Sequence, residues 1–381
     1  MLKLPRKHDG SDISIFSEMT ALAMQNNAIN LAQGFPDYEI DPKLKLFLAE
    51  ATDKNYNQYA PLAGNPVLIE NLKIFNSQRK LPLLLENQEI TITAGATYAI
   101  YTALATLLHF GDEVLVLEPS YDSYVPAIEV NGGTPVFVSM KDDFSVNWQD
   151  LKQKITSKTR AIIINSPHNP SGKIWKAQDF EQLWQCIKDT EIVVISDEVY
   201  DLLCYDDVTF YSAFHHPELK QRSFCIFSFG KMFHITGWKI GYILASEYFT
   251  TAFRRIHQYL IFSVNAPAQF ALAKYLEIFD VKKNSEMMQQ KRDFFLDQIQ
   301  DLPFTVHEKS TGSYFQTVSY EKISDLPDRE FSIWLTTEKK VASIPVSAFY
   351  HDHRNVGKIR FCFAKKEETI AKAIQYLKEK L

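Results

Sequence analysis

The sequence predicts an α/β protein with a mostly parallel central sheet sandwiched by helices, together with a smaller α+β domain. From Glu89 onward, short strand patterns alternate with helical patterns, as in strand–helix–strand units. Several strand patterns are continuously apolar, which is typical of strands buried on both faces. These patterns cover residues 136–138, 161–164, 192–195 and 224–227.

Chain length supports a second domain. A chain of 381 residues is longer than one hydrophobic core usually organises, and 46% of its residues are hydrophobic. We expect a large domain over 41–280 and a small C-terminal domain over 281–381. Residues 1–40 are expected to contribute to the small domain.

The region before the alternating pattern is mainly helical. Apolar spacing predicts helices at 14–26, 42–55 and 66–79, and a short strand at 28–31. Pro42 and Pro66 stand where two of these helices begin, a position that suits proline. Gly34 lies beside Pro36 in a turn that allows close approach of a ligand, although such a segment is more often simply a turn.

The alternating region continues with strands at 90–93 and 113–117. A helix is predicted at 98–108, and 119–130 combines turn residues with a helix. Helical patterns at 147–155 and 177–188 supply crossovers between parallel strands. Long helical patterns follow at 246–260 and 266–300, the second of which is expected to join the two domains. The small domain is predicted from strands at 305–306, 314–316, 341–344 and 358–363 and a closing helix at 366–381.

Composition excludes several classes of protein. The net charge is −5 with both signs interspersed, and the absence of a basic tract argues against a nucleic-acid partner. No run approaches the roughly 18 apolar residues of a membrane span. The segment from Met1 to Gly10 lacks the apolar core of a signal peptide, so we expect a soluble, cytoplasmic protein.

A metal site is not expected. The four cysteines, at positions 186, 204, 225 and 362, are too far apart for a zinc knuckle and are predicted to be free core thiols. His351, Asp352 and His353 could suggest a metal, but a solvated loop is favoured because no further ligand cluster has suitable spacing.

Four polar segments follow predicted strands directly. They are residues 95–97, 165–172, 197–200 and 228–231. Ligands of an open α/β sheet bind beyond the carboxyl ends of its strands, so one site could draw on all four segments.

Lys231 is the candidate reactive residue in the last of these segments. Burial or a nearby cation lowers the pKa of a lysine amine and lets it condense with a carbonyl group. The apolar residues around Lys231 would supply such burial. The stretch alone is equally compatible with an ordinary surface lysine in a loop between strands.

Asp197, Tyr200 and Asn169 are candidate partners of that lysine. A buried carboxylate beside a protonated ring nitrogen keeps the nitrogen cationic and makes the ring an electron sink, although Asp197 alone would more often be a structural cap. Tyr200 could donate a hydrogen bond to a phenolate oxygen. Asn169 lies between two prolines in a rigid loop that, by itself, would be interpreted as a turn.

Together these motifs resemble a known family. The motifs are N-P-S-G at 169–172, S-D-E-V-Y at 196–200, S-x-x-K at 228–231 and G-W-K-x-G-Y at 237–242. In this order they resemble the class I/II aminotransferases of fold type I, which use pyridoxal 5′-phosphate, and the resemblance covers nearly the whole chain. Within that family the sequence is most similar to bacterial methionine aminotransferases and to kynurenine/glutamine aminotransferases, whose Q-G-F-P-D segment is matched at 33–37.

The resemblance implies catalytic roles for matching residues. Lys231 would form the Schiff base with the cofactor and shuttle the proton. Asp197 would pair with the pyridine nitrogen, Asn169 and Tyr200 would donate to the ring oxygen, and Tyr121 would stack on the ring.

The resemblance also implies how the phosphate is bound. Ser228, Lys239 and the backbone of Ala96 and Thr97 would hold it, in agreement with the attraction of anions to a helix N-terminus. Lys239 stands where some branches carry arginine, so the contact there is a point charge. Tyr59 would reach the phosphate from the neighbouring subunit, which implies a homodimer.

Substrate recognition follows from the same resemblance. Arg360 would clamp the α-carboxylate bidentately, with help from Asn169 and the Gly34 backbone. Phe16 suggests a pocket for an apolar side chain, to which residues 1–40 would contribute. Asn265 lies where the kynurenine enzymes have aromatic and histidine residues and a longer segment. The implied donors are methionine first, then phenylalanine, tyrosine, kynurenine or glutamine, with a 2-oxo acid as acceptor and ping-pong kinetics.

Three alternatives remain at this stage. A carbon–sulfur β-lyase of the cysteine-conjugate or cystathionine type would use the same cofactor. The S-x-x-K motif also occurs in serine acyl-transfer enzymes, but the sequence has no S-D-N or K-T-G to complete that set. A non-catalytic ligand-binding or regulatory relative is the third, although no helix-turn-helix segment is appended.

Overall fold

The structure, a computed structural model, describes residues 7–8 and 13–380. Most of the segment from Met1 to Gly10, where the sequence predicts no signal peptide, lies outside the described residues, as does Leu381 at the end of the last predicted helix. Within the described part of the chain, no helix is long and apolar enough to cross a membrane.

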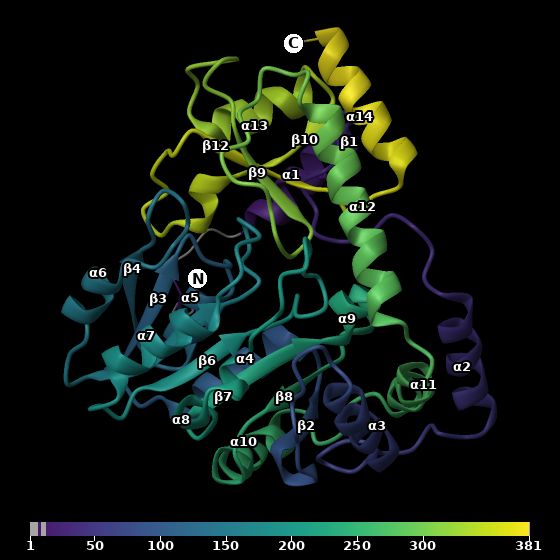
Figure 1. The fold of residues 1–381 in the computed structure, drawn as a ribbon, viewed down its shortest axis with the longest axis vertical. Helices are drawn as coiled ribbons and strands as arrows, with labels where there is room; N and C mark the ends of the chain where they lie inside the picture. The colour runs from purple at the N-terminus through teal and green to yellow at the C-terminus, as the bar shows by residue number, and fades with distance from the viewer. Residues whose placement is uncertain (1–6, 9–12, 381) are drawn as a thin grey trace, which may run out of the picture.

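A seven-stranded sheet forms the centre of the larger part of the molecule (Figure 1). Its order is β2-β8-β7-β6-β5-β3-β4, and only the pairs that include β8 are antiparallel. The prediction of an α/β protein with a mostly parallel sheet is therefore confirmed. The strands are β2 (Ile90–Thr93), β3 (Glu113–Glu118), β4 (Thr134–Ser139), β5 (Thr159–Asn165), β6 (Val193–Asp197), β7 (Ser223–Ser228) and β8 (Gly241–Leu244).

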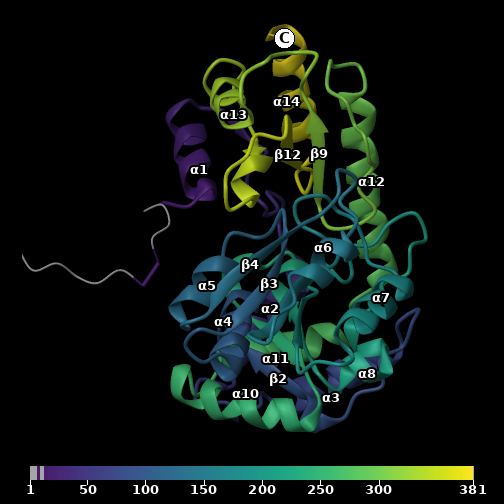
Figure 2. The same ribbon diagram turned by 90° about the vertical axis from the view of Figure 1, so that its left-hand side faces the viewer.

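The apolar strand runs are explained by two cores, one on each face of this sheet. In β5, Ala161 and Ile163 face one core, whereas Ile162 and Ile164 face the other. Because side chains alternate along a strand, burial of both faces requires consecutive apolar residues. Figure 2 shows α4 and α5 on one side of the sheet and α6 and α7 on the other. The helices of this part are α2 (Pro42–Asp53), α3 (Pro66–Ser77), α4 (Ala96–Leu107), α5 (Tyr124–Val130), α6 (Trp148–Gln153), α7 (Ala177–Ile187), α8 (Pro217–Lys220), α9 (Phe229–Met232), α10 (Glu247–Leu260) and α11 (Ala266–Leu276).

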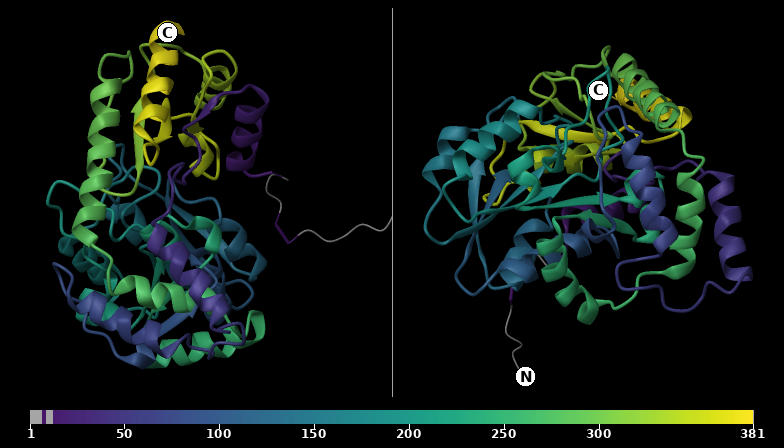
Figure 3. Two further views of the ribbon diagram at one scale, coloured as in Figure 1. Left: turned by 90° about the vertical axis from the view of Figure 1, so that its right-hand side faces the viewer. Right: turned by 60° about the horizontal axis from the view of Figure 1, so that its bottom comes forward.

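The C-terminal part has its own antiparallel sheet and its own core. Its strand order is β11-β12-β9, with β9 (Phe315–Ser319), β11 (Ile344–Pro345) and β12 (Lys358–Cys362). The helices are α12 (Val281–Ile299), α13 (Asp328–Thr337) and α14 (Glu367–Lys380). The long α12 runs beside α14 (Figure 3, left) and contributes Met288 and Phe295 to this core.

The N-terminal segment packs against these C-terminal elements. Strand β1 (Ile29–Asn30) pairs in parallel with β10 (Val341–Ala342), and α1 (Ile15–Gln25) contacts α13. Residues far apart in sequence are thereby brought to one end of the molecule. We propose the same division into domains at residues 40 and 280.

Several predicted elements were wrong in extent. The helical pattern at 266–300 forms two helices, because Asp280 caps a new helix by accepting a hydrogen bond from the Lys283 N–H. The predicted strand at 305–306 is only an isolated bridge between Thr305 and Ser319. The pattern at 341–344 divides into β10 and β11, which belong to different sheets.

Three elements, among them the short helix α8, and one local conformation were missed. Strand β8 begins inside the glycine-containing motif at 237–242 and ends two residues after it. Helix α13 was not predicted, although Phe331 and Leu335 have helical spacing and are fully buried. Lys231 lies on the short helix α9 rather than in a loop between strands. Of the four free cysteines, Cys225 and Cys362 are buried, whereas the other two are only partly buried.

Candidate active site

One cavity lies beyond the carboxyl ends of β2, β5, β6 and β7. Its cavity volume is about 150 Å³, and it opens to solvent. All four polar segments that follow these strands contribute to it, because parallel strands end at the same edge of the sheet. Its lining includes Gly95, Ala96, Thr97, Tyr121, Asn165, Asn169, Asp197, Tyr200, Ser228, Gly230, Lys231, Thr236 and Lys239.

Lys231 projects into this cavity from α9. Its Nζ donates hydrogen bonds to the Gly34 carbonyl oxygen, 3.1 Å away, and to the Tyr314 hydroxyl oxygen, 2.8 Å away. Burial lowers the pKa of the amine to about 8, and the positive charge of Arg360 acts in the same direction. The neutral, nucleophilic form of the amine is therefore far more accessible near neutral pH than in an ordinary lysine.

The hydrogen bonds of Lys231 also bear on the serine acyl-transfer alternative. That chemistry requires the lysine amine to contact the serine hydroxyl as its base. The Lys231 Nζ instead donates its hydrogen bonds to the Gly34 carbonyl and the Tyr314 hydroxyl. The arrangement favours amine chemistry at Lys231 over nucleophilic attack by Ser228.

Asp197 ends β6 inside the cavity and is only 5% exposed. Its Oδ2 accepts a hydrogen bond of 2.5 Å from the Tyr124 hydroxyl, and its Oδ1 accepts one of 3.4 Å from the Val199 N–H. Burial nevertheless raises the pKa of the carboxyl group to about 6. A cationic partner, such as a protonated ring nitrogen, would offset this burial and favour the carboxylate.

Tyr124 is a site residue that the sequence reasoning missed. It is 2% exposed and orients the Asp197 carboxylate from the first turn of α5. A signal was available, because Tyr124 lies three residues after Tyr121 at the start of a predicted helix, so both side chains point to the same face. The two rings are 5.7 Å apart in an edge-to-face arrangement.

The raised pKa of Asp197 predicts a change in stability in the protein freed of cofactor. A carboxyl group whose folded pKa exceeds its unfolded value of 3.8 contributes stability that is fully present below that value and is lost as the pH rises through about 6. Asp197→Asn cannot ionise, so it should gain stability over the wild type across this range, by up to about 3 kcal/mol above pH 6. Urea unfolding of both cofactor-free proteins at several pH values measures the difference.

Asp206→Asn is the matched control for this experiment. Hydrogen bonds from Arg292 hold the pKa of the Asp206 carboxyl group below its usual value, so that substitution should lose stability at neutral pH. An Asp197→Asn variant whose stability relative to the wild type does not change with pH would contradict the expected cost of the buried carboxylate.

Arg360 reaches the site from β12 of the C-terminal sheet and is 1% exposed. Its Nη1 donates to Asn169 Oδ1 at 2.7 Å and its Nη2 donates to the Ala32 carbonyl at 2.8 Å. Its Nε has no hydrogen-bond partner among the described residues. Burial lowers the pKa of the guanidinium to about 10. A buried cation with an unpaired N–H is costly, and a bidentate carboxylate would satisfy both its charge and its donor.

Aromatic rings surround this guanidinium. Its central carbon lies 3.8 Å from the centroid of Phe315, 5.3 Å from that of Phe16 and 5.2 Å from that of Phe349. Cation–π attraction stabilises the arginine in this setting. A carboxylate bound there would carry its side chain into largely apolar surroundings.

Asn169 and Tyr200 approach the same space from adjacent strand ends. The Asn169 side-chain oxygen is occupied by Arg360, so its amide N–H groups are the donors left for a ligand. Burial raises the pKa of the Tyr200 hydroxyl well above its usual value, which keeps it a hydrogen-bond donor. Both can therefore donate to a ring oxygen.

The other end of the cavity suits an anion. Helix α4 begins at Ala96 and Thr97, and its N-cap is Gly95, at φ +88°, which offers no side chain to the free N–H groups. A Cβ on Gly95 would lie 3.5 Å from the Lys239 backbone, and Lys239 lines the same cavity as the start of α4. Free N–H groups and a lysine at a helix N-terminus form a phosphate site.

These observations fit pyridoxal 5′-phosphate as the ligand of this cavity. The α4 N-terminus with Lys239 and Ser228 suits its phosphate, and Asp197 suits its ring nitrogen. Tyr121 lines the wall between these two ends, and burial raises the pKa of its hydroxyl to about 12. The amine of Lys231 is available for its aldehyde.

The remaining predicted residues are placed differently from one another. Phe16 lies beside Arg360, and the Gly34 carbonyl accepts a hydrogen bond from Lys231 at the site. Tyr59 does not line the cavity: it is 81% exposed and contacts the ring of Phe262 edge to face at 5.3 Å. Its expected role in a neighbouring subunit stays a prediction.

No metal-like cluster of three or more His, Cys, Asp or Glu side chains occurs in the part of the chain that the structure describes. His351 is engaged elsewhere, because its Nδ1 pairs with Glu118 Oε2 at 2.8 Å. Its ring also stacks on Phe137 with centroids 3.9 Å apart.

Comparisons with known proteins agree with this geometry. Residues 26–377 match the family described as aminotransferase class I and II. The chain is 41% identical over 374 residues to methionine aminotransferase from Escherichia coli, covering 96% of this chain and 95% of that protein. It is 32% identical over 413 residues to human kynurenine–oxoglutarate transaminase 1, covering 99% and 97%. A crystal structure of an Escherichia coli protein with a methionine aminotransferase function has a TM-score of 0.94 at 40% identity and full coverage of both chains.

Proposed function

Because the chain belongs to the class I and II aminotransferase family, and is thus a fold type I enzyme dependent on pyridoxal 5′-phosphate, we propose that its amino donor is an L-amino acid with an apolar or aromatic side chain. The donor we favour is methionine, with phenylalanine, tyrosine, kynurenine and glutamine as further candidates. The observation that carries this proposal is the unpaired Nε of buried Arg360 among the rings of Phe16, Phe315 and Phe349. It supplies one carboxylate clamp beside an apolar space.

The site residues each have a defined part in the proposed reaction. When bound, the cofactor supplies a ring that withdraws electrons from the substrate Cα. Arg360 and Asn169 hold the substrate carboxylate, which fixes the orientation of the Cα–H bond. The amine of Lys231 would remove the proton from Cα and return it to the carbon that carried the aldehyde of the cofactor, which leaves the amino group on the cofactor.

Asp197 supports this proton transfer from the opposite end of the ring. Its carboxylate, oriented by Tyr124, would keep the ring nitrogen of the cofactor protonated, and a protonated ring supplies the positive charge that stabilises negative charge at Cα. Asn169 and Tyr200 would donate hydrogen bonds to the ring oxygen of the bound cofactor. The amino group passes to a second 2-oxo acid in a separate half-reaction, so we propose ping-pong kinetics.

A panel of amino acids tests the donor preference. The purified enzyme is incubated with methionine, phenylalanine, tyrosine, kynurenine, glutamine and aspartate, each with a 2-oxo acid acceptor, and both products are quantified. We expect kcat/KM to be highest for methionine and lowest for aspartate, because the rings of Phe16, Phe315 and Phe349 around Arg360 favour an apolar side chain over a second carboxylate. A preference for aspartate would overturn the proposal.

The same panel separates transamination from carbon–sulfur β-elimination. Cysteine conjugates and cystathionine are added as donors without any acceptor. Release of pyruvate and ammonia at a rate exceeding that of methionine transamination would replace the proposed activity by that of a β-lyase.

We propose further that the enzyme is a homodimer in which Tyr59 of one subunit reaches the phosphate site of the other. The exposed rings of Tyr59 and Phe262, which contact each other, support an interface at this surface. Light scattering of the active enzyme should give twice the mass of the chain, and a fully active monomer would contradict the proposal.

A further inference from the structure

Two polar groups from distant parts of the chain meet at the Lys231 amine. Nζ donates to the Gly34 carbonyl at 3.1 Å and to the Tyr314 hydroxyl at 2.8 Å, and that hydroxyl donates to the same carbonyl at 2.5 Å. We propose that Gly34 and Tyr314 form the resting place of the Lys231 amine whenever it is not bonded to the cofactor, and that Tyr314 thereby orients its lone pair. This inference rests on the proposed function and adds a positioning residue to it.

Counting donors and acceptors shows why this arrangement orients the lone pair. The Tyr314 hydroxyl has one hydrogen, which it gives to the Gly34 carbonyl, so toward Lys231 it can only accept. A neutral amine has two N–H bonds and one lone pair. With both N–H bonds directed to these two oxygens, the lone pair is left to face the cavity, where the substrate Cα must lie for proton transfer.

Tyr314 does not itself take part in proton transfer. It is fully buried, and burial raises the pKa of its hydroxyl well above the usual value, so the group remains protonated. The ring is fixed by packing edge to face on Tyr200, with centroids 5.1 Å apart. Its hydroxyl is therefore a rigid acceptor for the amine.

The backbone before Tyr314 is held in an unusual conformation. Ser313 has φ +61°, in the left-handed region that disfavours residues with a side chain. Its N–H donates to the Leu203 carbonyl at 3.0 Å, and the Tyr314 carbonyl accepts from the Phe363 N–H at 3.0 Å. Such strain persists when the surroundings determine the conformation, and it is common at functional sites.

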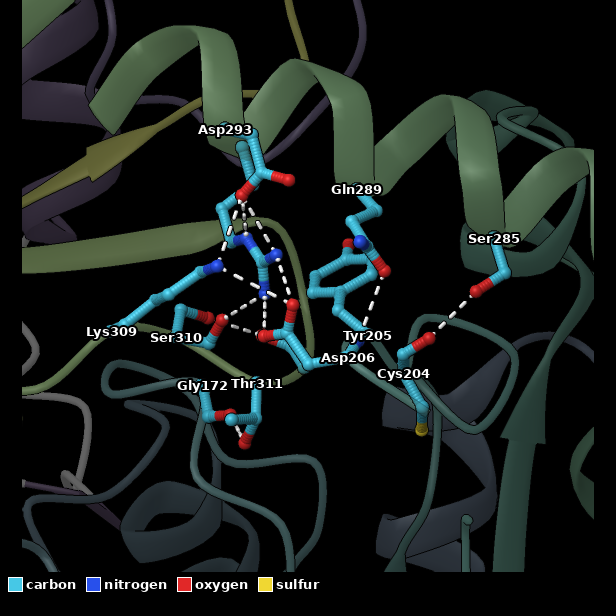
Figure 4. A network of polar contacts seen from close by, with 12 residues as sticks. Gly172, Cys204, Tyr205, Asp206, Ser285, Gln289, Asp293, Lys309, Ser310 and Thr311 are labelled. Atoms are coloured by element: carbon cyan, nitrogen blue, oxygen red, sulfur yellow. Dashed lines mark hydrogen bonds and ion pairs between the residues drawn. The ribbon is translucent and has the colours of Figure 1, made fainter. Parts of the chain in front are cut away.

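An ionic network centred on the buried Arg292 anchors the segment that leads to Tyr314 (Figure 4). Arg292 on α12 is fully buried, pairs with both oxygens of Asp206 at 2.6 and 2.8 Å, and donates to the Ser310 carbonyl at 2.9 Å. Lys309 contacts Asp206 and Asp293 at 3.3 Å each. The Tyr314 hydroxyl is thus placed by the fold before the amine arrives, so little ordering is required during the reaction.

Other charged and titratable groups lie near Lys231. Within residues 7–8 and 13–380, none of them forms a hydrogen bond with its Nζ. Asp197 and Cys362 raise the pKa of the amine, whereas Arg360 and Lys239 lower it. These groups set the charge around the amine. Among the described residues only Gly34 and Tyr314 accept hydrogen bonds from its nitrogen, which also lies 5.7 Å from the centroid of the Tyr200 ring, so these two acceptors set the direction of its N–H bonds.

Tyr314→Phe removes the acceptor and keeps the ring. The matched control is Tyr205→Phe, because Tyr205 is equally buried and its hydroxyl donates to the Ser313 carbonyl, next to Tyr314 but not to Lys231. Circular dichroism and thermal melting are first used to establish that both variants are folded and that both bind the cofactor.

The first measurement uses the full-length protein freed of cofactor. Lys231 is labelled with acetic anhydride at a series of pH values, and its modification is quantified by peptide mass spectrometry. The midpoint of the labelling curve should fall by at least about half a pH unit in Tyr314→Phe, because the protonated amine loses the shorter of its two hydrogen bonds. Tyr205→Phe should match the wild type.

The second measurement uses the loaded enzyme in a single half-reaction with methionine. The rate should fall at least about 10-fold in Tyr314→Phe, the isotope effect of α-deuterated methionine should increase, and the dissociation constant of methionine should stay within about twofold. A labelling midpoint and isotope effect equal to those of Tyr205→Phe would overturn the role of Tyr314. The proposed function can fail separately from this inference. A wild-type protein without transaminase activity would still show, by the labelling of Lys231, whether Tyr314 contacts its amine.

Discussion

Lys231→Ala should lose transaminase activity by at least about 10³-fold in kcat, because the covalent link to the cofactor and the base that moves the Cα proton are removed together. The purified wild type is expected to show a visible absorption band that depends on Lys231, and the variant should lack that band. Absorption spectra with added cofactor and a coupled assay for the 2-oxo acid product measure the two effects. The expectation follows from the lowered pKa of about 8 and from the position of Nζ inside the cavity.

Lys239→Ala is the matched control for this experiment. It removes a lysine from the same cavity, but at the end that suits the phosphate. We expect it to weaken cofactor binding and to regain the visible band when cofactor is in excess. A wild-type protein that stays colourless in excess cofactor would contradict the assignment of Lys231.

Arg360→Ala should raise the KM for amino acids by about 10²- to 10³-fold, because a charged bidentate contact with the substrate carboxylate is lost. The cofactor should remain bound, since the phosphate site lies on α4 and around Lys239 rather than on β12. Initial rates over a range of methionine concentrations and the intensity of the visible band measure the two quantities.

Arg292→Ala controls for the loss of a buried arginine. Arg292 is fully buried like Arg360, but it pairs with Asp206 outside the cavity. This variant should be less stable without a comparable rise in KM when assayed well below its melting temperature. An unchanged KM in Arg360→Ala would exclude this arginine from carboxylate binding.

Much of the site could be predicted because its residues follow strands. Asn169, Asp197 and Lys231 each stand just after a continuous apolar run, and the rule that parallel strands end at one edge brought them together before the structure was known. Burial on both faces leaves a strong local pattern in such strands. The helix that joins the two parts was less well predicted, because the cap at Asp280 interrupts a pattern whose apolar spacing continues.

Residues from the C-terminal sheet were harder to predict from pattern alone. Tyr314 lies 83 residues from Lys231, beside a strand whose pattern says only that its side chains are buried. Arg360 carried an expectation only through the resemblance to the aminotransferases. The local sequence around Tyr314 or Arg360 does not indicate which part of the seven-stranded sheet each residue faces, because that depends on how the two cores pack together.

The sequence by itself determined the α/β class, the cavity edge of the sheet and the order of the motifs that identify the family. These features depend on alternation, apolar runs and short-range chemistry, all of which are local. Only the tertiary structure decided that the Arg360 Nε is left without a partner, that Tyr124 orients Asp197 and that Tyr314 holds the Lys231 amine. Those contacts join residues distant in sequence, and their hydrogen-bond geometry exists only once the two sheets have packed against each other.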